Sequence, residues 1–155
     1  MKIAFGAALP VGVGGLRECF DLQMTRYIAP EKAAAALMAA SVPDLMVTSC
    51  ESIGSKDPAA SVAYPISTYR VVLSEAPQTI EVPAEITVIR KKKEKTIVPA
   101  EFIVGEIEAN KNILEFTLEA KPTGSLRPDV LVRHLTAAEP AVFPLSITRT
   151  EQRVV

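Results

Sequence analysis

The chain has 155 residues, of which 48% are hydrophobic and 23% are charged, and its formal net charge is −1 at pH 7. This length fits one compact domain or two small halves packed on each other, and this composition is typical of a globular chain rather than a disordered one. A net charge near zero provides no global attraction to nucleic acid, so any such binding requires a local basic patch.

Long apolar segments and clusters of metal ligands are both missing from the sequence. No apolar run approaches the roughly 20 residues that span a bilayer, so we expect a cytoplasmic protein that does not enter the membrane. The two cysteines, Cys19 and Cys50, lie far apart and neither is part of a C-x-x-C motif, which predicts reduced and packed thiols. With His134 as the only histidine, we expect neither a zinc or iron–sulfur site nor any other cofactor.

In the first 55 residues the hydrophobic pattern predicts strands on either side of one helix. A strand is predicted before Pro10, and the glycine-rich residues 10–15 are predicted to be a turn and not a phosphate-binding loop, since they lack the third glycine of G-x-G-x-x-G. Residues 17–25 alternate as a half-buried strand does. Residues 30–40 then predict a helix, with Pro30 at its first position and its end near Ser41. Residues 45–48 predict another strand, which gives the order β-β-α-β.

Residues 56–155 predict a second half. Strands are expected at 68–73, 86–90, 96–98, 114–118 and 145–152, a loop at 75–83 and a helix at 128–137. The strands at 86–90 and 96–98 flank a polar run, and together they predict a hairpin whose tip is basic.

This pattern predicts an α+β fold of mainly antiparallel sheets with helices on one face. We interpret it as two ferredoxin-like halves, residues 1–55 and 56–155, which can pack as one domain. The first half falls short of the ferredoxin-like unit by about one β-α pair.

Several ordered segments resemble a known family. They are FGAALPVGV at 5–13, ECFDL at 18–22, the Pro-Glu helix start at 30–31, YRV at 69–71, RKKK at 90–93, GSLRP at 124–128 and ITRTE at 147–151. Together they resemble the bacterial radical-SAM-linked domain of unknown function. The resemblance implies a radical-SAM enzyme as partner, fused to the domain or encoded beside it. It also implies a further N-terminal segment, which we expect to be missing here.

The basic hairpin is the sharpest local feature of the sequence. Its candidate anion-binding residues are Arg90, Lys91, Lys92, Lys93 and Lys95. Such a cluster can contact several phosphates and predicts salt-dependent RNA binding. The alternative is a solvated turn whose lysines keep the strand edges from aggregating. No aromatic residue lies among the charges, so no platform for base stacking is evident.

The segment 124–128 is a second candidate for anion binding. Ser125 and Arg127 precede a predicted helix N-terminus, where backbone N–H groups and the helix dipole favour anions. Arg127 can clamp a phosphate or a carboxylate through two hydrogen bonds. The alternative is structural, because Gly124 also suits a turn and Pro128 also suits a helix start.

The sequence identifies no catalytic set. His134 lies at the edge of an apolar helix face, with no nucleophile or orienting acid that the sequence places beside it, which favours a structural role. We therefore expect a noncatalytic accessory domain that helps a radical-SAM enzyme engage an RNA substrate. The alternative is a protein-interaction module, which docks on a partner or forms a homo-oligomer through its incomplete first half. Turnover that depends on Arg127 or His134 would instead indicate an enzyme.

Overall fold

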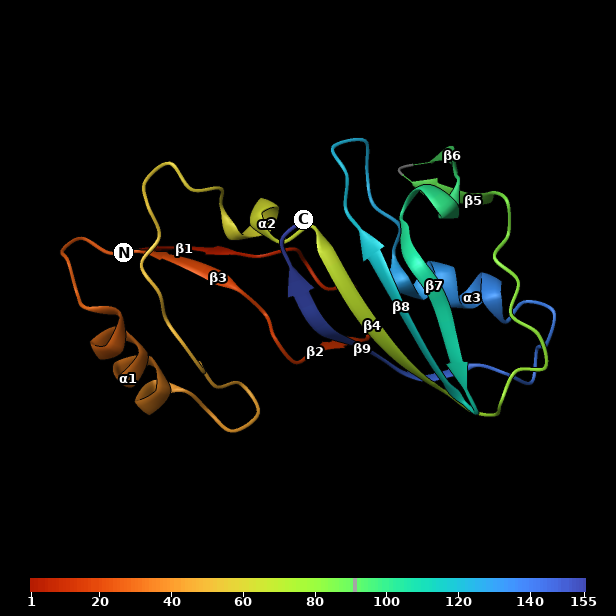
Figure 1. Cartoon of the computed structure of the whole chain (residues 1–155), viewed down its shortest axis with the longest axis horizontal. Coiled ribbons are helices and arrows are strands. Elements are labelled where there is room, and N and C mark those ends of the chain that lie inside the picture. The colour runs from red at the N-terminus through yellow and green to blue at the C-terminus, as the bar shows by residue number, and fades with distance from the viewer. Residues whose placement is uncertain (91) are drawn as a thin grey trace.

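The structure is a computed structural model, and it describes residues 1–90 and 92–155. Its centre is a five-stranded sheet in the order β2-β9-β4-β8-β7 (Figure 1). The strands are β2 Val13–Gly15, β9 Pro144–Arg153, β4 Ile66–Leu73, β8 Ile113–Glu119 and β7 Ile103–Asn110. All neighbours in this sheet are antiparallel except β2 and β9, which run parallel. The predicted α+β class with mainly antiparallel sheets is confirmed.

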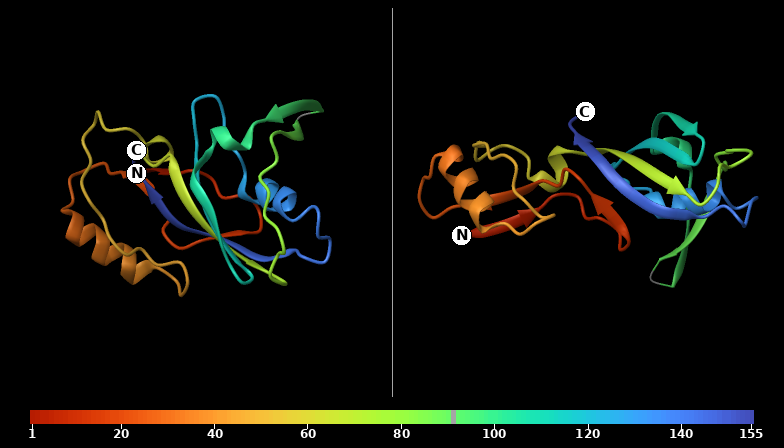
Figure 2. Two further views of the ribbon diagram at one scale, coloured as in Figure 1. Left: turned by 45° about the vertical axis from the view of Figure 1, so that its right-hand side comes forward. Right: turned by 90° about the horizontal axis from the view of Figure 1, so that it is seen from below.

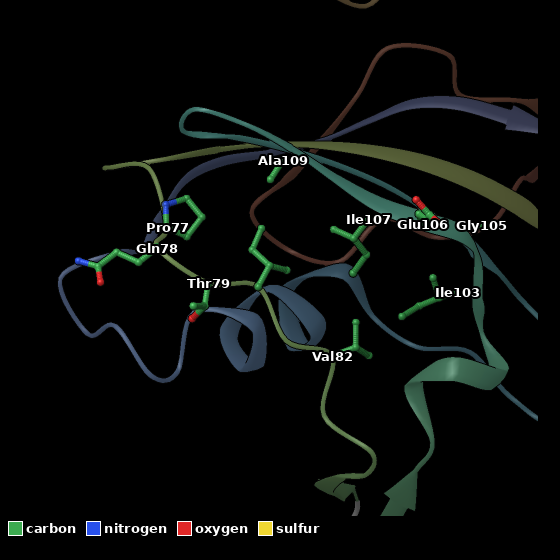
Figure 3. Close-up of a pocket in the computed structure, with 10 residues that line it drawn as sticks. Pro77, Gln78, Thr79, Val82, Ile103, Gly105, Glu106, Ile107 and Ala109 are labelled. Carbon is green, nitrogen blue, oxygen red and sulfur yellow. The ribbon is translucent and has the colours of Figure 1, made fainter.

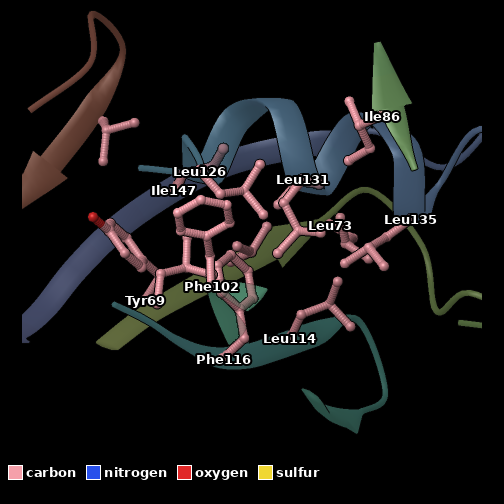
Figure 4. Packing of buried hydrophobic residues seen from close by; sticks show 14 of the residues in the cluster. Tyr69, Leu73, Ile86, Phe102, Leu114, Phe116, Leu126, Leu131, Leu135 and Ile147 are labelled. Carbon is pink, nitrogen blue, oxygen red and sulfur yellow. The ribbon is translucent and has the colours of Figure 1, made fainter. Parts of the chain in front are cut away.

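One face of the large sheet carries the hydrophobic core. Tyr69 of β4 lies opposite Phe116 of β8, and Val71 lies opposite Leu114, so that alternate residues of both strands point to the same side. All four are buried, and the rings of Tyr69 and Phe116 stack with centroids 5.7 Å apart. The helix α3, Pro128–Leu135, covers this face and buries Leu131 among the strands (Figure 4).

A separate two-stranded hairpin contributes one residue to the core beside α3. It consists of β5, Ile86–Arg90, and β6, Lys93–Ile97. Ile86 is 1% exposed and belongs to the core cluster, so the base of the hairpin is anchored while its far end projects. A short 3₁₀ helix, η1 Pro99–Glu101, leads from the hairpin into β7.

The first part of the chain lies beside the large sheet rather than on its face. There β1, Lys2–Phe5, pairs with β3, Phe20–Gln23, and the helix α1 spans Pro30–Ala40. The single-turn helix α2, Ala60–Ala63, connects this part to β4. Figures 1 and 2 show α1, β1 and β3 beyond the edge formed by β2 and β9. The described part of the chain contains no helix that is long and apolar enough to cross a membrane.

An ion pair between a buried arginine and a partly exposed glutamate joins this first part to the large sheet. Arg149 of β9 is 2% exposed, and its Nε donates to Glu18 Oε1 at 2.9 Å. Its Nη2 donates to the other Glu18 oxygen and to the carbonyl of Ala7, the latter at 2.6 Å. Burial by itself lowers the pKa of Arg149, but the hydrogen bond and charge of Glu18 outweigh it, so the pKa lies above its ordinary value. A β-carbon at Gly15 would collide with the Glu18 side chain, so this glycine makes room for the pair.

Two predictions about the first part are wrong. Residues 13–15 are not a turn but the strand β2, because β9 offers them a free edge with which to pair. Residues 45–48 do not form a strand: a single bridge joins Val42 to Leu45, and Asp44 between them has φ 67°, the geometry of a tight turn. The helix predicted at 30–40, with its end at Ser41, is confirmed.

The second part differs from its prediction at β7 and at the hairpin tip. The strand β7 was not predicted, because a register shift between Val104 and Glu108 interrupts its alternation. Lys93 and Lys95 were assigned to the tip but lie in β6. The helix predicted at 128–137 is confirmed as α3, which in the described part of residues 56–155 is the one α-helix longer than a single turn. The division at residue 55 stays a prediction, although β2 joins the sheet across it.

Candidate functional site

Two basic residues of the hairpin lie on the same face of β6 as Ile97, which pairs with the buried Ile86. Lys95 lies opposite Val88 and Ile97 lies opposite Ile86, so Lys93, Lys95 and Ile97 follow each other on the same face of the strand. Lys92 precedes them in the turn, with φ 64°. All three lysines are exposed, and none forms a salt bridge with the residues that the structure describes. The side chain of Arg90 and the whole of Lys91 lie outside the described part.

The second candidate segment forms a tight turn close to this hairpin. Lys121 and Gly124 exchange backbone hydrogen bonds of 2.8 and 2.9 Å, and Gly124 has φ 145°, where a side chain would be strained. Ser125 is exposed, whereas Leu126 is buried in the core and fixes the position of the turn.

Lys95 connects the two segments. A β-carbon at Gly124 would lie only 3.2 Å from Lys95 Nζ, so the ammonium group rests directly against the glycine. Since Gly124 has no side chain, the ammonium can approach the backbone of the turn. The structure therefore brings the hairpin and the segment around Ser125 together, although the sequence separates them by almost thirty residues.

Arg127 is engaged differently from the lysines. Its Nε donates to Asp129 Oδ1 at 2.9 Å, and its Nη2 donates to Oδ2 at 2.8 Å. This bidentate pair lies at the N-terminus of α3, where the Asp129 carboxylate already supplies a favourable negative charge. An external anion at Arg127 would have to compete with Asp129, so the exposed lysines are the better placed phosphate contacts.

The electrostatics of this surface suit a phosphate chain more than a single buried anion. Lys92, Lys93 and Lys95 are solvated point charges, and a partner with several phosphates could meet them in succession. Lys121 also lies here but interacts with Glu119 at 3.7 Å. Glu94 points to the opposite face of β6, away from Lys93 and Lys95. We refer to Lys92, Lys93, Lys95 and the 121–125 turn as the basic surface.

The other titratable candidates lie apart from the basic surface. His134 Nδ1 is 2.9 Å from the Val130 carbonyl, a contact within one turn of α3. Cys19 and Cys50 are free thiols, and burial raises the pKa of Cys19, which the neighbouring Glu18 carboxylate raises further. Within residues 1–90 and 92–155, no group of three or more His, Cys, Asp or Glu side chains is arranged to hold a metal ion.

Comparison with known proteins identifies a family. A family model described as an uncharacterized protein conserved in bacteria (DUF2344) matches residues 1–128. No curated protein and no solved structure shows a significant match to the chain. The family match covers most of the chain, including β1 to β8 and the whole basic surface. The chain belongs to the bacterial DUF2344 family of uncharacterized proteins.

Proposed function

We propose that this chain is a noncatalytic accessory domain that helps a radical-SAM enzyme engage an RNA substrate. The proposed RNA-binding element is the basic surface. The observation that carries this proposal is the contact of Lys95 Nζ with Gly124, which unites two segments that each have features suited to anions. The resemblance of segments such as GSLRP and RKKK to the radical-SAM-linked domain supports the choice of enzyme partner.

The expected binding mode is electrostatic and tolerant of sequence. Lysines that contact phosphates release condensed counterions, and each contact to a single strand contributes about −0.7 to the slope of log K against log salt. The described part of the basic surface presents no exposed aromatic ring on which bases could stack. We therefore expect contacts to the RNA backbone rather than readout of base edges.

Neutralising the lysines tests this proposal. The variant Lys92→Gln/Lys93→Gln/Lys95→Gln should lower the affinity for a single-stranded oligoribonucleotide and reduce the salt slope by about 2, since three phosphate contacts are lost. The measurement is fluorescence anisotropy at several salt concentrations.

The matched control for this variant makes the same change of charge elsewhere. It is Lys32→Gln/Lys56→Gln/Lys111→Gln, which replaces three exposed lysines outside the basic surface. The control should bind as the unmodified chain does. Equal slopes for all three proteins would rule out the basic surface as the RNA contact.

A second function, protein interaction, is favoured by the first part of the chain. The helix α1 has no buried residue, although it is largely apolar. Elsewhere in the first part of the chain, several large apolar side chains are exposed, including Phe5 at 71%, Tyr27 at 83% and Leu45 at 77%. Exposed apolar side chains gathered in one region mark interaction surfaces more often than isolated ones do. We propose that this region docks on a second protein or on a second copy of the chain.

Replacing two of these side chains distinguishes the two partners. Phe5→Ser/Leu45→Ser should lower self-association if the region binds a second copy, measured by sedimentation velocity over a range of protein concentrations. If the region binds the radical-SAM enzyme, the variant should lose co-purification with that enzyme and stay unchanged in sedimentation. A variant that behaves as the unmodified chain in both measurements would contradict this second function.

A further inference from the structure

A groove lies between β7 and the loop 75–83, on the side of the molecule away from the first part of the chain (Figure 3). Its volume is about 440 Å³, within the range of sites that hold a ligand. Its loop wall contains Pro77, Ile80 and Val82, and its strand wall contains Ile103 and Ile107. Figure 3 shows Ile103 and Ile107 on the strand facing the loop that carries Val82.

The strand wall is a sheet edge. β7 is the last strand in the order of the large sheet and pairs with β8 on one side only. Among the described residues, no hydrogen bond is found from its other edge. Such an edge presents unpaired N–H and C=O groups, which can pair with another extended chain.

The register of β7 limits where a partner can pair. The shift between Val104 and Glu108 includes Gly105, whose φ is 75°, so this part of the edge is distorted. From Glu108 to Asn110 the pairing with β8 is regular. A bulge discourages indiscriminate edge pairing, which leaves the two regular ends of β7, at 103–104 and 108–110, as the pairing segments.

The loop wall is held in place before any partner binds. The carboxylate of Glu139 accepts hydrogen bonds from the backbone N–H of Gln78, at 2.9 and 3.1 Å, and from that of Thr79, at 3.2 Å. Ile80 also packs against the core cluster. A preformed wall reduces the ordering cost of binding, which favours affinity.

The charges beside the groove identify the chemistry of its occupant. Glu106 lines the groove, and Glu81 lies between the lining residues Ile80 and Val82. Both glutamates are exposed. Among the residues that the structure describes, no lysine, arginine or histidine lines the groove. An apolar groove with an acidic border suits a chain that combines apolar and basic side chains, and it disfavours RNA.

We propose that this groove binds an extended peptide of a partner protein, which adds to β7 as a further strand. Its alternate apolar side chains enter between β7 and the loop 75–83, and a flanking lysine or arginine meets Glu106. Main-chain hydrogen bonds to a sheet edge supply affinity in this mode, and the side-chain pockets supply specificity. The groove is separate from the basic surface, so this proposal does not depend on RNA binding.

A pair of synthetic peptides tests the proposal. The probe is a capped octapeptide that alternates valine and threonine between two terminal lysines, and its counterpart carries glutamates at both ends. We expect the lysine peptide to bind saturably and to shift the backbone amides of β7 and of residues 77–82 in NMR spectra. A proline in the middle of the peptide should abolish binding, because it removes a main-chain donor.

Charge exchange at Glu106 provides the decisive variant. Glu106→Lys should weaken the lysine peptide by about tenfold and improve the glutamate peptide, because the attraction at the border is reversed. Glu31→Lys on α1 is the matched control and should change neither. The proposal is overturned if neither peptide saturates, if Glu106→Lys leaves the preference unchanged, or if the shifted amides lie elsewhere. It is also overturned if the chain dimerises through β7 without peptide, because the occupant is then a second copy.

Discussion

Phe116→Ala is expected to lower the free energy of unfolding by about 4 kcal/mol, because it removes a buried ring and leaves a cavity. Phe116 is 2% exposed and lies where β8, β4 and α3 meet. Its stacking with Tyr69 is lost as well, and neither neighbouring strand can close the space without breaking its ladder. Chemical denaturation followed by circular dichroism measures this loss.

Phe143→Ala is the matched control for the core variant. Phe143 is 53% exposed, so its truncation should cost less than about 1 kcal/mol. A loss at Phe116 no larger than the loss at Phe143 would contradict the packing of α3 on the sheet.

Removing one member of the Arg149–Glu18 pair should have the second large effect. Glu18→Ala removes the carboxylate from a buried guanidinium, but Glu18 is itself 37% exposed and water can partly replace it, so the loss should be about 2 kcal/mol. Arg149→Met should cost less than Glu18→Ala, because methionine removes the charge and fills part of the volume. Adding Arg149→Met to Glu18→Ala should therefore recover stability. The measurement is a double-mutant cycle of unfolding free energies.

An exposed ion pair serves as control for that cycle. Arg70 and Glu115 are 3.6 Å apart on the open face of the sheet, and both side chains are about half exposed. Glu115→Ala should therefore cost no more than about 1 kcal/mol. Additive losses at Glu18 and Arg149 would show that the two side chains do not act as a pair.

The sequence predicted those strands whose pattern is local. In β8, Leu114, Phe116 and Leu118 alternate with polar residues, and the structure buries all three. The helix at 30–40 was equally predictable from the sequence, since Pro30 and the alanines after it specify its start and its body.

Strands that depend on distant partners could not be predicted in this way. Residues 13–15 contain two glycines and extend only because β9, some 130 residues later, pairs with them. The apolar run at 45–48 has the composition of a strand. No strand of the described part pairs with it, and Leu45 and Met46 stay exposed. In β7 the bulge at Gly105 hides the period of two that the sequence pattern requires.

The candidate site was predictable as two segments but not as one surface. The lysines and the GSLRP segment are visible in the sequence, whereas the approach of Lys95 to Gly124 depends on how the hairpin folds over α3. The pairing of Arg127 with Asp129 could have been suspected from their spacing of two residues. The Glu18–Arg149 pair could not, because 131 residues separate its members.

The central claim is that the hairpin and the 121–125 turn act as one RNA-binding surface, and an NMR titration tests it most directly. A single-stranded oligoribonucleotide is added to the ¹⁵N-labelled chain, and the backbone amides are followed. We predict that amides from Lys92 to Lys95 and from Lys121 to Ser125 shift together, with one dissociation constant that weakens as salt rises. Shifts confined to one of the two segments, or found only elsewhere on the chain, would contradict the claim.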